Sequence, residues 1–323
     1  MLARIFLVLT MLIAPVAAQA SAPDAKGYVD TAPGVSVYYE RYGTGPNVIL
    51  IPGRLFMPEF ASLARPDRTL IQYDMRNRGR SKRAEDTAQL TILGDVADVE
   101  ALRRHFGAEK VSLVGFSYLG LMVALYSAQY PDRVERVAQI GPVPRKFGTP
   151  YAADQQAGDD SLSAEGKAAA ADWAALRANL EKPDVKIDPK AGCEVLQLYS
   201  SYRLVGTPAN YAGVPDNCPL ENESLAAMNR HFAAHFGDLQ KRDFPREAFT
   251  KLEQPVLTLH GTLDRNAPYG SGLEWATTFR NGRLVTVEGG AHQLWLDDPA
   301  VLADIDRFLA GEWPARAQRF GRE

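Results

Sequence analysis

Two parts of the chain alternate short apolar runs with helical stretches. Apolar residues from Ile92 to Phe106 recur in steps of three and four, which marks one face of a helix that Gly107 ends. An alternating run at residues 35–41 predicts an early antiparallel strand. Further short, mostly apolar runs predict strands at residues 47–51, 69–73, 110–114 and 134–140. This order predicts an α/β fold with a mainly parallel sheet and helices on both faces.

The alternation stops after Gly141-Pro142, and residues 143–250 are helical and loop-like in pattern, with no clear strand. Beyond them the sequence predicts strands at residues 255–260 and 283–287 and helices near residues 271–280 and 299–310. We therefore expect one α/β core domain, formed by residues 27–142 and 251–311, which a helical insertion at residues 143–250 interrupts.

The N-terminus has the layout of a signal peptide. Arg4 precedes an uncharged run from Ile5 to Ala18, and Ala18-Gln19-Ala20 offers small residues for cleavage after Ala20. This run is shorter than the ~20 apolar residues that span a bilayer, which disfavours the alternative of a membrane anchor. We expect residues 1–20 to be a signal peptide and the protein to be exported, periplasmic or secreted, without a stable membrane anchor.

Export would place the two cysteines where disulfides persist. Cys193 and Cys218 permit a single pairing, across turn-rich chain, and we predict a disulfide between them, with two free thiols as the alternative. Two cysteines exclude a four-thiolate zinc site. The 46% hydrophobic residues exclude a disordered chain, and Lys+Arg 36 against Asp+Glu 39 gives no electrostatic case for a nucleic-acid partner.

The strongest candidate for chemistry is a serine between a strand and a helix. The run Gly115-Phe116-Ser117 leaves the predicted strand at 110–114 and enters a helical stretch at 121–130. A serine on such a tight turn projects its hydroxyl above the sheet edge, beside the N–H groups of the helix start. Leu119 stands where such turns usually carry a second glycine, which follows at Gly120. A purely structural serine is the alternative.

A serine hydroxyl needs a base to activate it, and the base needs an acid to orient it. Asp264 follows the predicted strand at 255–260, and His292 follows the strand at 283–287. All three residues therefore stand after carboxyl ends of parallel strands, where open α/β sheets hold their sites, and Ser…Asp…His is a known triad order. Asp264 as a helix cap and His292 as an ordinary loop residue are the alternatives. Glu288 is a competing acid, and we interpret His260 as structural.

This arrangement resembles the α/β-hydrolase superfamily over nearly the whole chain after the signal peptide. Residues 74–81 are similar to its Asp-x-Arg-Gly-x-Gly-x-Ser loop, with Asn77 replacing the first glycine. Residues 98–107 are similar to the helix that precedes its nucleophile strand, and residues 128–134 to its link from the nucleophile helix to the next strand. The resemblance implies that the insertion is a cap over the catalytic residues. It also implies an oxyanion hole formed by the backbone N–H groups of Arg54 and Tyr118, although Pro52 replaces the family's histidine. The Arg54 side chain could serve packing or bind a substrate carboxylate.

These residues predict a serine hydrolase that cleaves a small ester or amide and needs neither metal nor organic cofactor. The near balance of charge fits a small, uncharged substrate or a short peptide. One alternative is an aminopeptidase of the prolyl-iminopeptidase type, in which Met228 would stand at the position of the acid that holds the substrate amine. A non-catalytic binding protein, perhydrolysis and carbon–carbon cleavage are further alternatives. His231 and His235 have a spacing that could hold a metal, but no third ligand suggests itself, and we predict a packing role.

Overall fold

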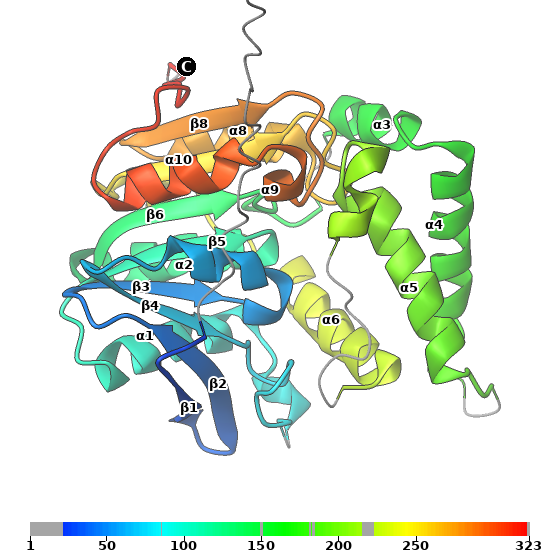
Figure 1. The fold of residues 1–323 in the computed structure, drawn as a ribbon, viewed down its shortest axis with the longest axis horizontal. Helices are drawn as coiled ribbons and strands as arrows, with labels where there is room; N and C mark the ends of the chain where they lie inside the picture. The colour runs from blue at the N-terminus through cyan, green and yellow to red at the C-terminus, as the bar shows by residue number, and fades with distance from the viewer. Residues whose placement is uncertain are drawn as a thin grey trace, which may run out of the picture.

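An eight-stranded sheet forms the centre of the molecule, with strand order β1-β2-β4-β3-β5-β6-β7-β8 (Figure 1). The computed structural model describes residues 22–84, 86–148, 151–180, 182, 185–214 and 223–321. The predicted signal peptide, residues 1–20, lies outside these ranges. β1 pairs with β2, and β2 with β4, in antiparallel fashion, whereas the strands from β4 to β8 run parallel. The strands are β1 Ala25–Ala32, β2 Val35–Tyr42, β3 Asn47–Pro52, β4 Arg68–Tyr73, β5 Val111–Phe116, β6 Val134–Ile140, β7 Val256–Gly261 and β8 Gly282–Val287.

Each strand expected from the sequence is present, with ends that differ by at most two residues. The additional strand is β1, which the hydrophobic pattern did not predict because Val29 is its only fully buried residue. β1 lies at the edge of the sheet, where Val29 pairs with Val37 of β2. An edge strand exposes most of its side chains, so it leaves a weak apolar signal.

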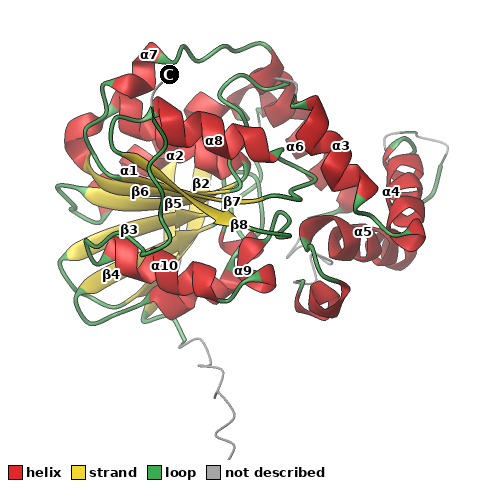
Figure 2. Cartoon of the chain, turned by 90° about the horizontal axis from the view of Figure 1, so that it is seen from above, coloured by secondary structure: helices red, strands yellow, loops and turns green. Residues whose placement is uncertain are grey.

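Helices cover both faces of the sheet (Figure 2). One face packs against α1 Ile92–His105, α2 Tyr118–Gln129, α7 Glu247–Thr250 and α8 Tyr269–Thr278, and the other against α9 Leu294–Asp297 and α10 Ala300–Leu309. Buried Val96, Leu121 and Trp275 belong to the first cluster, and Trp295 and Ile305 to the second. The predicted α/β fold with two covered faces is therefore confirmed.

Between β6 and α7 the chain forms helices that lie beside the sheet (Figure 1). They are α3 Ala152–Asp160, α4 Ala164–Arg177, α5 Pro189–Leu204 and α6 Leu225–Gln240. A carboxylate of α6, Asp238, accepts a hydrogen bond of 3.1 Å from the Ile92 N–H at the start of α1. This contact stabilises the start of α1, since the first turn of a helix has N–H groups without helical partners.

Cys193 lies on α5, whereas Cys218 lies outside the described residues, so the disulfide stays a prediction.

Deep inside this arrangement, one arginine joins the helices of the insertion to the sheet. Arg265 follows β7 and is almost fully buried. Its guanidinium donates hydrogen bonds to two carbonyl oxygens, that of Gly158 at 3.1 Å and that of Val205 at 2.7 Å. It also donates to the hydroxyl of Ser161 at 2.7 Å. The ends of α3 and α5 are thus held beside the loop that carries Asp264.

In the part of the chain that the structure describes, no helix is long and apolar enough to cross a membrane.

Candidate active site

Ser117 lies in a strained turn between β5 and α2. Its backbone has φ 57° and ψ −124°, and Asn77 is the only other non-glycine residue in the described ranges with a positive φ. The Ser117 N–H donates to the Ile140 carbonyl of β6 at 2.8 Å, and the Ser117 carbonyl accepts from the Gly120 N–H at 2.9 Å. Residues Val111–Phe116 before it are fully buried, whereas Ser117 is partly exposed. Such strain persists where the surroundings fix it, which is typical of functional sites.

The flanking glycines explain how the turn tolerates a leucine where a glycine is usual. A Cβ atom at Gly115 would collide with the carbonyl oxygen of Leu119, so this position needs glycine. A Cβ atom at Gly120 would lie 2.9 Å from the Pro142 Cβ. The side chain of Leu119 instead reaches over Gly53, the glycine before Arg54. The departure from the family pattern therefore leaves the tight turn intact.

Asp264 and His292 form a buried hydrogen-bonded pair. Oδ2 of Asp264 lies 2.7 Å from Nδ1 of His292, and Oδ1 accepts from the backbone N–H groups of Asn266 and Ala267, both at 2.8 Å. Burial raises the pKa of Asp264, but the charge of His292 and hydrogen bonds from His260 and His292 outweigh this and lower its pKa below the usual range. Asp264 is therefore ionised at neutral pH, and Nε2 of His292 is left for other chemistry.

The competing assignments are resolved by burial and contacts. Glu288 is exposed, so it is not the partner of His292. His260 is fully buried, and its Nε2 lies 2.7 Å from the Ala267 carbonyl and 3.4 Å from Asp264 Oδ2. The contacts of His260 support the structural role expected from the sequence.

Gly141 is a residue of this site that the sequence analysis missed. It follows β6 with φ +48°, and a Cβ atom there would lie 2.9 Å from Oδ2 of Asp264 and 3.2 Å from Nδ1 of His292. The pair thus occupies space that only glycine leaves open. The available signal was the glycine itself, at the carboxyl end of a predicted parallel strand.

Ser117 and His292 line a common cavity of about 390 Å³ beneath the helices of the insertion. Most of its wall is apolar, and α4, α5 and α6 contribute Trp173, Leu196, Tyr199, Met228 and Phe232. Three arginines also line it, namely Arg78, Arg177 and Arg203, and the described lining contains no aspartate or glutamate. This cavity has the size and the mainly apolar wall that are typical of small-molecule sites.

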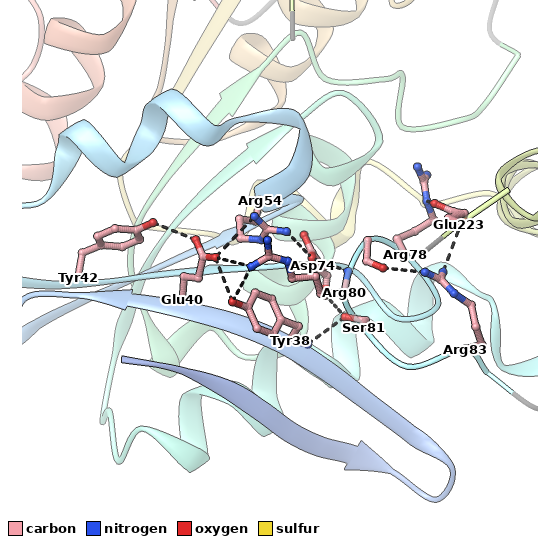
Figure 3. A network of polar contacts seen from close by, with 11 residues as sticks. Tyr38, Glu40, Tyr42, Arg54, Asp74, Arg78, Arg80, Ser81, Arg83 and Glu223 are labelled. Atoms are coloured by element: carbon pink, nitrogen blue, oxygen red, sulfur yellow. Dashed lines mark hydrogen bonds and ion pairs between the residues drawn. The ribbon is translucent and has the colours of Figure 1, made fainter. Parts of the chain in front are cut away.

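The sequence left two roles open for the side chain of Arg54, packing and binding of a substrate carboxylate. The contacts of this side chain support the packing role. Its guanidinium is 2.9 Å from Asp74 and 3.7 Å from Glu40, and it lies over the Tyr38 ring at 5.3 Å (Figure 3). None of these atoms belongs to the cavity wall. The backbone N–H of Arg54 follows Gly53, which has φ +77°, and so belongs to the turn after β3.

Tyr118 is held by a buried polar network. Its hydroxyl donates to Oδ2 of Asp95 at 2.6 Å, and Nε2 of His235 on α6 lies 3.0 Å from the same oxygen. Burial and the nearby Asp95 charge raise the pKa of Tyr118 well above its ordinary value, so its hydroxyl remains protonated. The network fixes the first residue of α2, whose backbone N–H stands directly after Ser117.

The rings of the two histidines of α6 pack against each other. The rings of His231 and His235 are 4.1 Å apart. Across the described ranges, no three His, Cys, Asp or Glu side chains are grouped so that they could hold a metal ion.

Comparisons with known proteins agree with this geometry. Residues 46–299 match the α/β-hydrolase fold family. The chain is 24% identical over 283 residues to the bifunctional esterase/perhydrolase DCH of Acinetobacter calcoaceticus, an alignment that covers 82% of this chain and 92% of the relative. It is 29% identical over 106 residues to a proline iminopeptidase of Saccharolobus solfataricus, which covers 30% of this chain and 34% of that protein.

Solved structures show the same fold. An esterase from Exiguobacterium antarcticum superposes with a TM-score of 0.66 at 16% identity, over 88% of this chain and 98% of the esterase. The 2-hydroxy-6-oxo-6-phenylhexa-2,4-dienoate hydrolase of Rhodococcus sp. strain RHA1 superposes with a TM-score of 0.63 at 19% identity, over 89% and 99% of the two chains. Because the family match spans most of the chain and the sheet, turn and cavity agree with it, the chain belongs to the α/β-hydrolase fold family and is a hydrolase.

Proposed function

We propose that the protein is a serine hydrolase that cleaves a small ester through an acyl-enzyme on Ser117. The observation that carries this proposal is the 2.7 Å hydrogen bond between Asp264 and His292, because His292 lines the same cavity as the strained Ser117. His292 is the general base, and Asp264 orients it. The backbone N–H groups of Arg54 and Tyr118 form the oxyanion hole.

In the first step, Oγ of Ser117 attacks the carbonyl carbon of the ester and its proton passes to Nε2 of His292. Asp264 stabilises the resulting imidazolium, because it is ionised and bonded to Nδ1. Negative charge develops on the former carbonyl oxygen, where each N–H donor contributes about 3–4 kcal/mol to transition-state stabilisation. The alcohol then leaves with the proton from His292, and the acyl group remains on Ser117.

In the second step, water attacks the acyl-enzyme and gives a proton to His292, and the acid product leaves as Ser117 regains its proton. No metal or organic cofactor takes part in this scheme. A peroxide could replace water in the same step, so perhydrolysis, which forms part of the name of the Acinetobacter relative, remains a compatible activity.

An ester fits the cavity better than the substrate of an aminopeptidase. A prolyl-iminopeptidase type of enzyme would have to hold a protonated amine in this cavity, beside Arg78, Arg177 and Arg203. Like charges repel strongly at low dielectric. A non-catalytic binding protein would also have no use for the strained backbone of Ser117, which costs about 1–3 kcal/mol.

A fluorophosphonate probe tests the proposal directly. We expect covalent labelling at Ser117, located by peptide mass spectrometry, and loss of both labelling and ester hydrolysis in folded Ser117→Ala. A panel of acyl esters beside aminoacyl-anilides separates an esterase from a peptidase. Labelling at another residue, or full activity in Ser117→Ala, would contradict the proposed nucleophile.

We further propose that the protein is exported after cleavage behind Ala20 and that Cys193 pairs with Cys218. The apolar run after Arg4 and the single possible cysteine pairing support this. N-terminal sequencing of protein recovered from cells tests the cleavage, and non-reducing peptide mapping tests the disulfide. An intact Met1 or two alkylated thiols would refute the respective proposal.

A further inference from the structure

The guanidinium of Arg78 is buried in the cavity wall, and four of its five N–H donors have no partner among the described residues. Its Nε donates to Oε2 of Glu223 at 2.8 Å, and neither side chain is exposed. Nη1 and Nη2 have no hydrogen-bond partner among the described residues. The group lies between two aromatic rings, 5.3 Å from the centre of Phe56 and 4.7 Å from that of Phe232. A buried charged donor without a partner is costly and calls for an explanation.

His231 presents a second unused polar group in the same wall. It is fully buried, lines the cavity, and has neither Nδ1 nor Nε2 in a hydrogen bond within the described structure. It is the neighbour of Phe232, whose ring contacts Arg78. Burial, followed by the positive charges of His235, Arg78 and Arg83, lowers the pKa of His231 well below its ordinary value. A neutral imidazole can still donate one hydrogen bond.

Further charged side chains lie around these two residues. Glu223 is shared, since its Oε2 accepts from Arg78 and its Oε1 lies 3.7 Å from Nη1 of Arg83 (Figure 3). Two arginines therefore share one carboxylate, so Glu223 is not reserved for Arg78. Arg177 and Arg203 also line the cavity, and Nη1 of Arg203 lies 3.3 Å from Asp159.

We propose that Arg78 and His231 form a subsite for a carboxylate of the substrate, on either side of the scissile ester bond. A guanidinium offers two parallel N–H groups that match the two oxygens of a carboxylate. Unpartnered guanidinium donors in a mainly apolar cavity fit a monoanion, whose desolvation their hydrogen bonds can offset. The substrate class is thus an ester that also bears a free carboxylate, in place of the uncharged substrate that the overall charge suggested. This subsite rests on the proposed function.

Matched ester pairs test the subsite with the wild-type protein. Monoethyl adipate against ethyl hexanoate places the charge on the acyl side, and 4-acetoxybenzoate against phenyl acetate places it on the alcohol side. We expect the anionic ester to have the higher kcat/KM in one pair, by about tenfold or more. Equal or lower values for the anionic ester in both pairs would overturn the proposal.

Variants then assign the preference to particular side chains. The double variant Arg78→Met/Glu223→Gln removes both charges of the buried pair, and we expect its anionic preference to fall to about one while neutral esters are still hydrolysed. His231→Phe keeps an aromatic ring at this position and removes the hydrogen-bond donor, and should reduce the preference for the anionic ester about threefold. The control is Arg80→Gln, which removes the same charge from the same loop. The Arg80 side chain is bonded to Tyr38 outside the cavity, so this variant should keep the wild-type preference. An unchanged preference in the double variant would refute the subsite.

A binding measurement separates failure of the subsite from failure of the proposed function. Calorimetric titration with hexanoate and with hexanamide needs no turnover. We expect hexanoate to bind the wild-type protein at least about tenfold more tightly, and this difference to vanish in the double variant. Equal binding of acid and amide would overturn the subsite even in an active enzyme. Tight hexanoate binding with no labelling at Ser117 would support the subsite and refute the nucleophile alone.

Discussion

Replacing Gly141 by alanine would insert one carbon atom beside the hydrogen bond between Asp264 and His292. The new Cβ would lie 2.9 Å from Oδ2 of Asp264 and 3.2 Å from Nδ1 of His292, whereas ordinary contacts of a Cβ atom lie at 3.4–4 Å. The pair must therefore move by roughly half an ångström. Since a displacement of about 1 Å in a catalytic group can cost about 100-fold, we expect kcat to fall about tenfold or more. KM should change much less, because the cavity wall around the substrate is not altered.

Alanine at this position also has a backbone cost, because φ is +48°. The left-handed region costs a residue with a Cβ about 1–2 kcal/mol. Gly107 provides a matched control, since it has φ +64° but no atom within 4 Å of the Cβ that alanine would add. Gly107→Ala should therefore show the backbone cost without the collision.

The two variants are compared by urea unfolding and by steady-state hydrolysis of an ester. Gly107→Ala should lose about 1–2 kcal/mol of unfolding free energy and Gly141→Ala at least as much, and only Gly141→Ala should lose kcat. If Gly141→Ala keeps the wild-type kcat while it is destabilised like Gly107→Ala, then the space at residue 141 does not position His292, and the reasoning is wrong.

Two further variants test buried polar side chains. Arg265→Met leaves the carbonyls of Gly158 and Val205 without their donor, so it should lower stability by about 3 kcal/mol and speed limited proteolysis within α3–α5. Equal cleavage in wild type and variant would contradict this. His231→Phe should flatten the acid side of the stability profile. The folded pKa of wild-type His231 lies below its unfolded value of about 6.5, so the unfolded chain takes up a proton first and stability falls below pH 6.5, by up to about 1.4 kcal/mol per pH unit. Urea titrations between pH 5 and 7.5 measure this, and parallel profiles would refute it.

The parallel strands could be predicted closely because each is a short apolar run between polar turns. β5, for example, is buried along its whole length, and its sequence shows this directly. β1 could not be predicted, since an edge strand with one buried residue lacks that pattern. Ser117, Asp264 and His292 could be proposed together because loops at the carboxyl ends of parallel strands meet at one sheet edge. The sequence favours Asp264 over Glu288 as the partner of His292 without deciding between them. The structure decides it, because Glu288 is exposed and Asp264 is bonded to His292.

By itself, the sequence determined the α/β fold, the family and the three residues proposed to act on the substrate, because strand periodicity and turn motifs are local properties of the chain. Only the tertiary structure brought Arg78, from the loop after β4, against Glu223 and Phe232 from the far side of the insertion. The same holds for Gly141, whose missing side chain makes room for a pair formed by two distant loops. The charge inside a cavity depends on which side chains are buried together and left without partners, and overall composition does not record this.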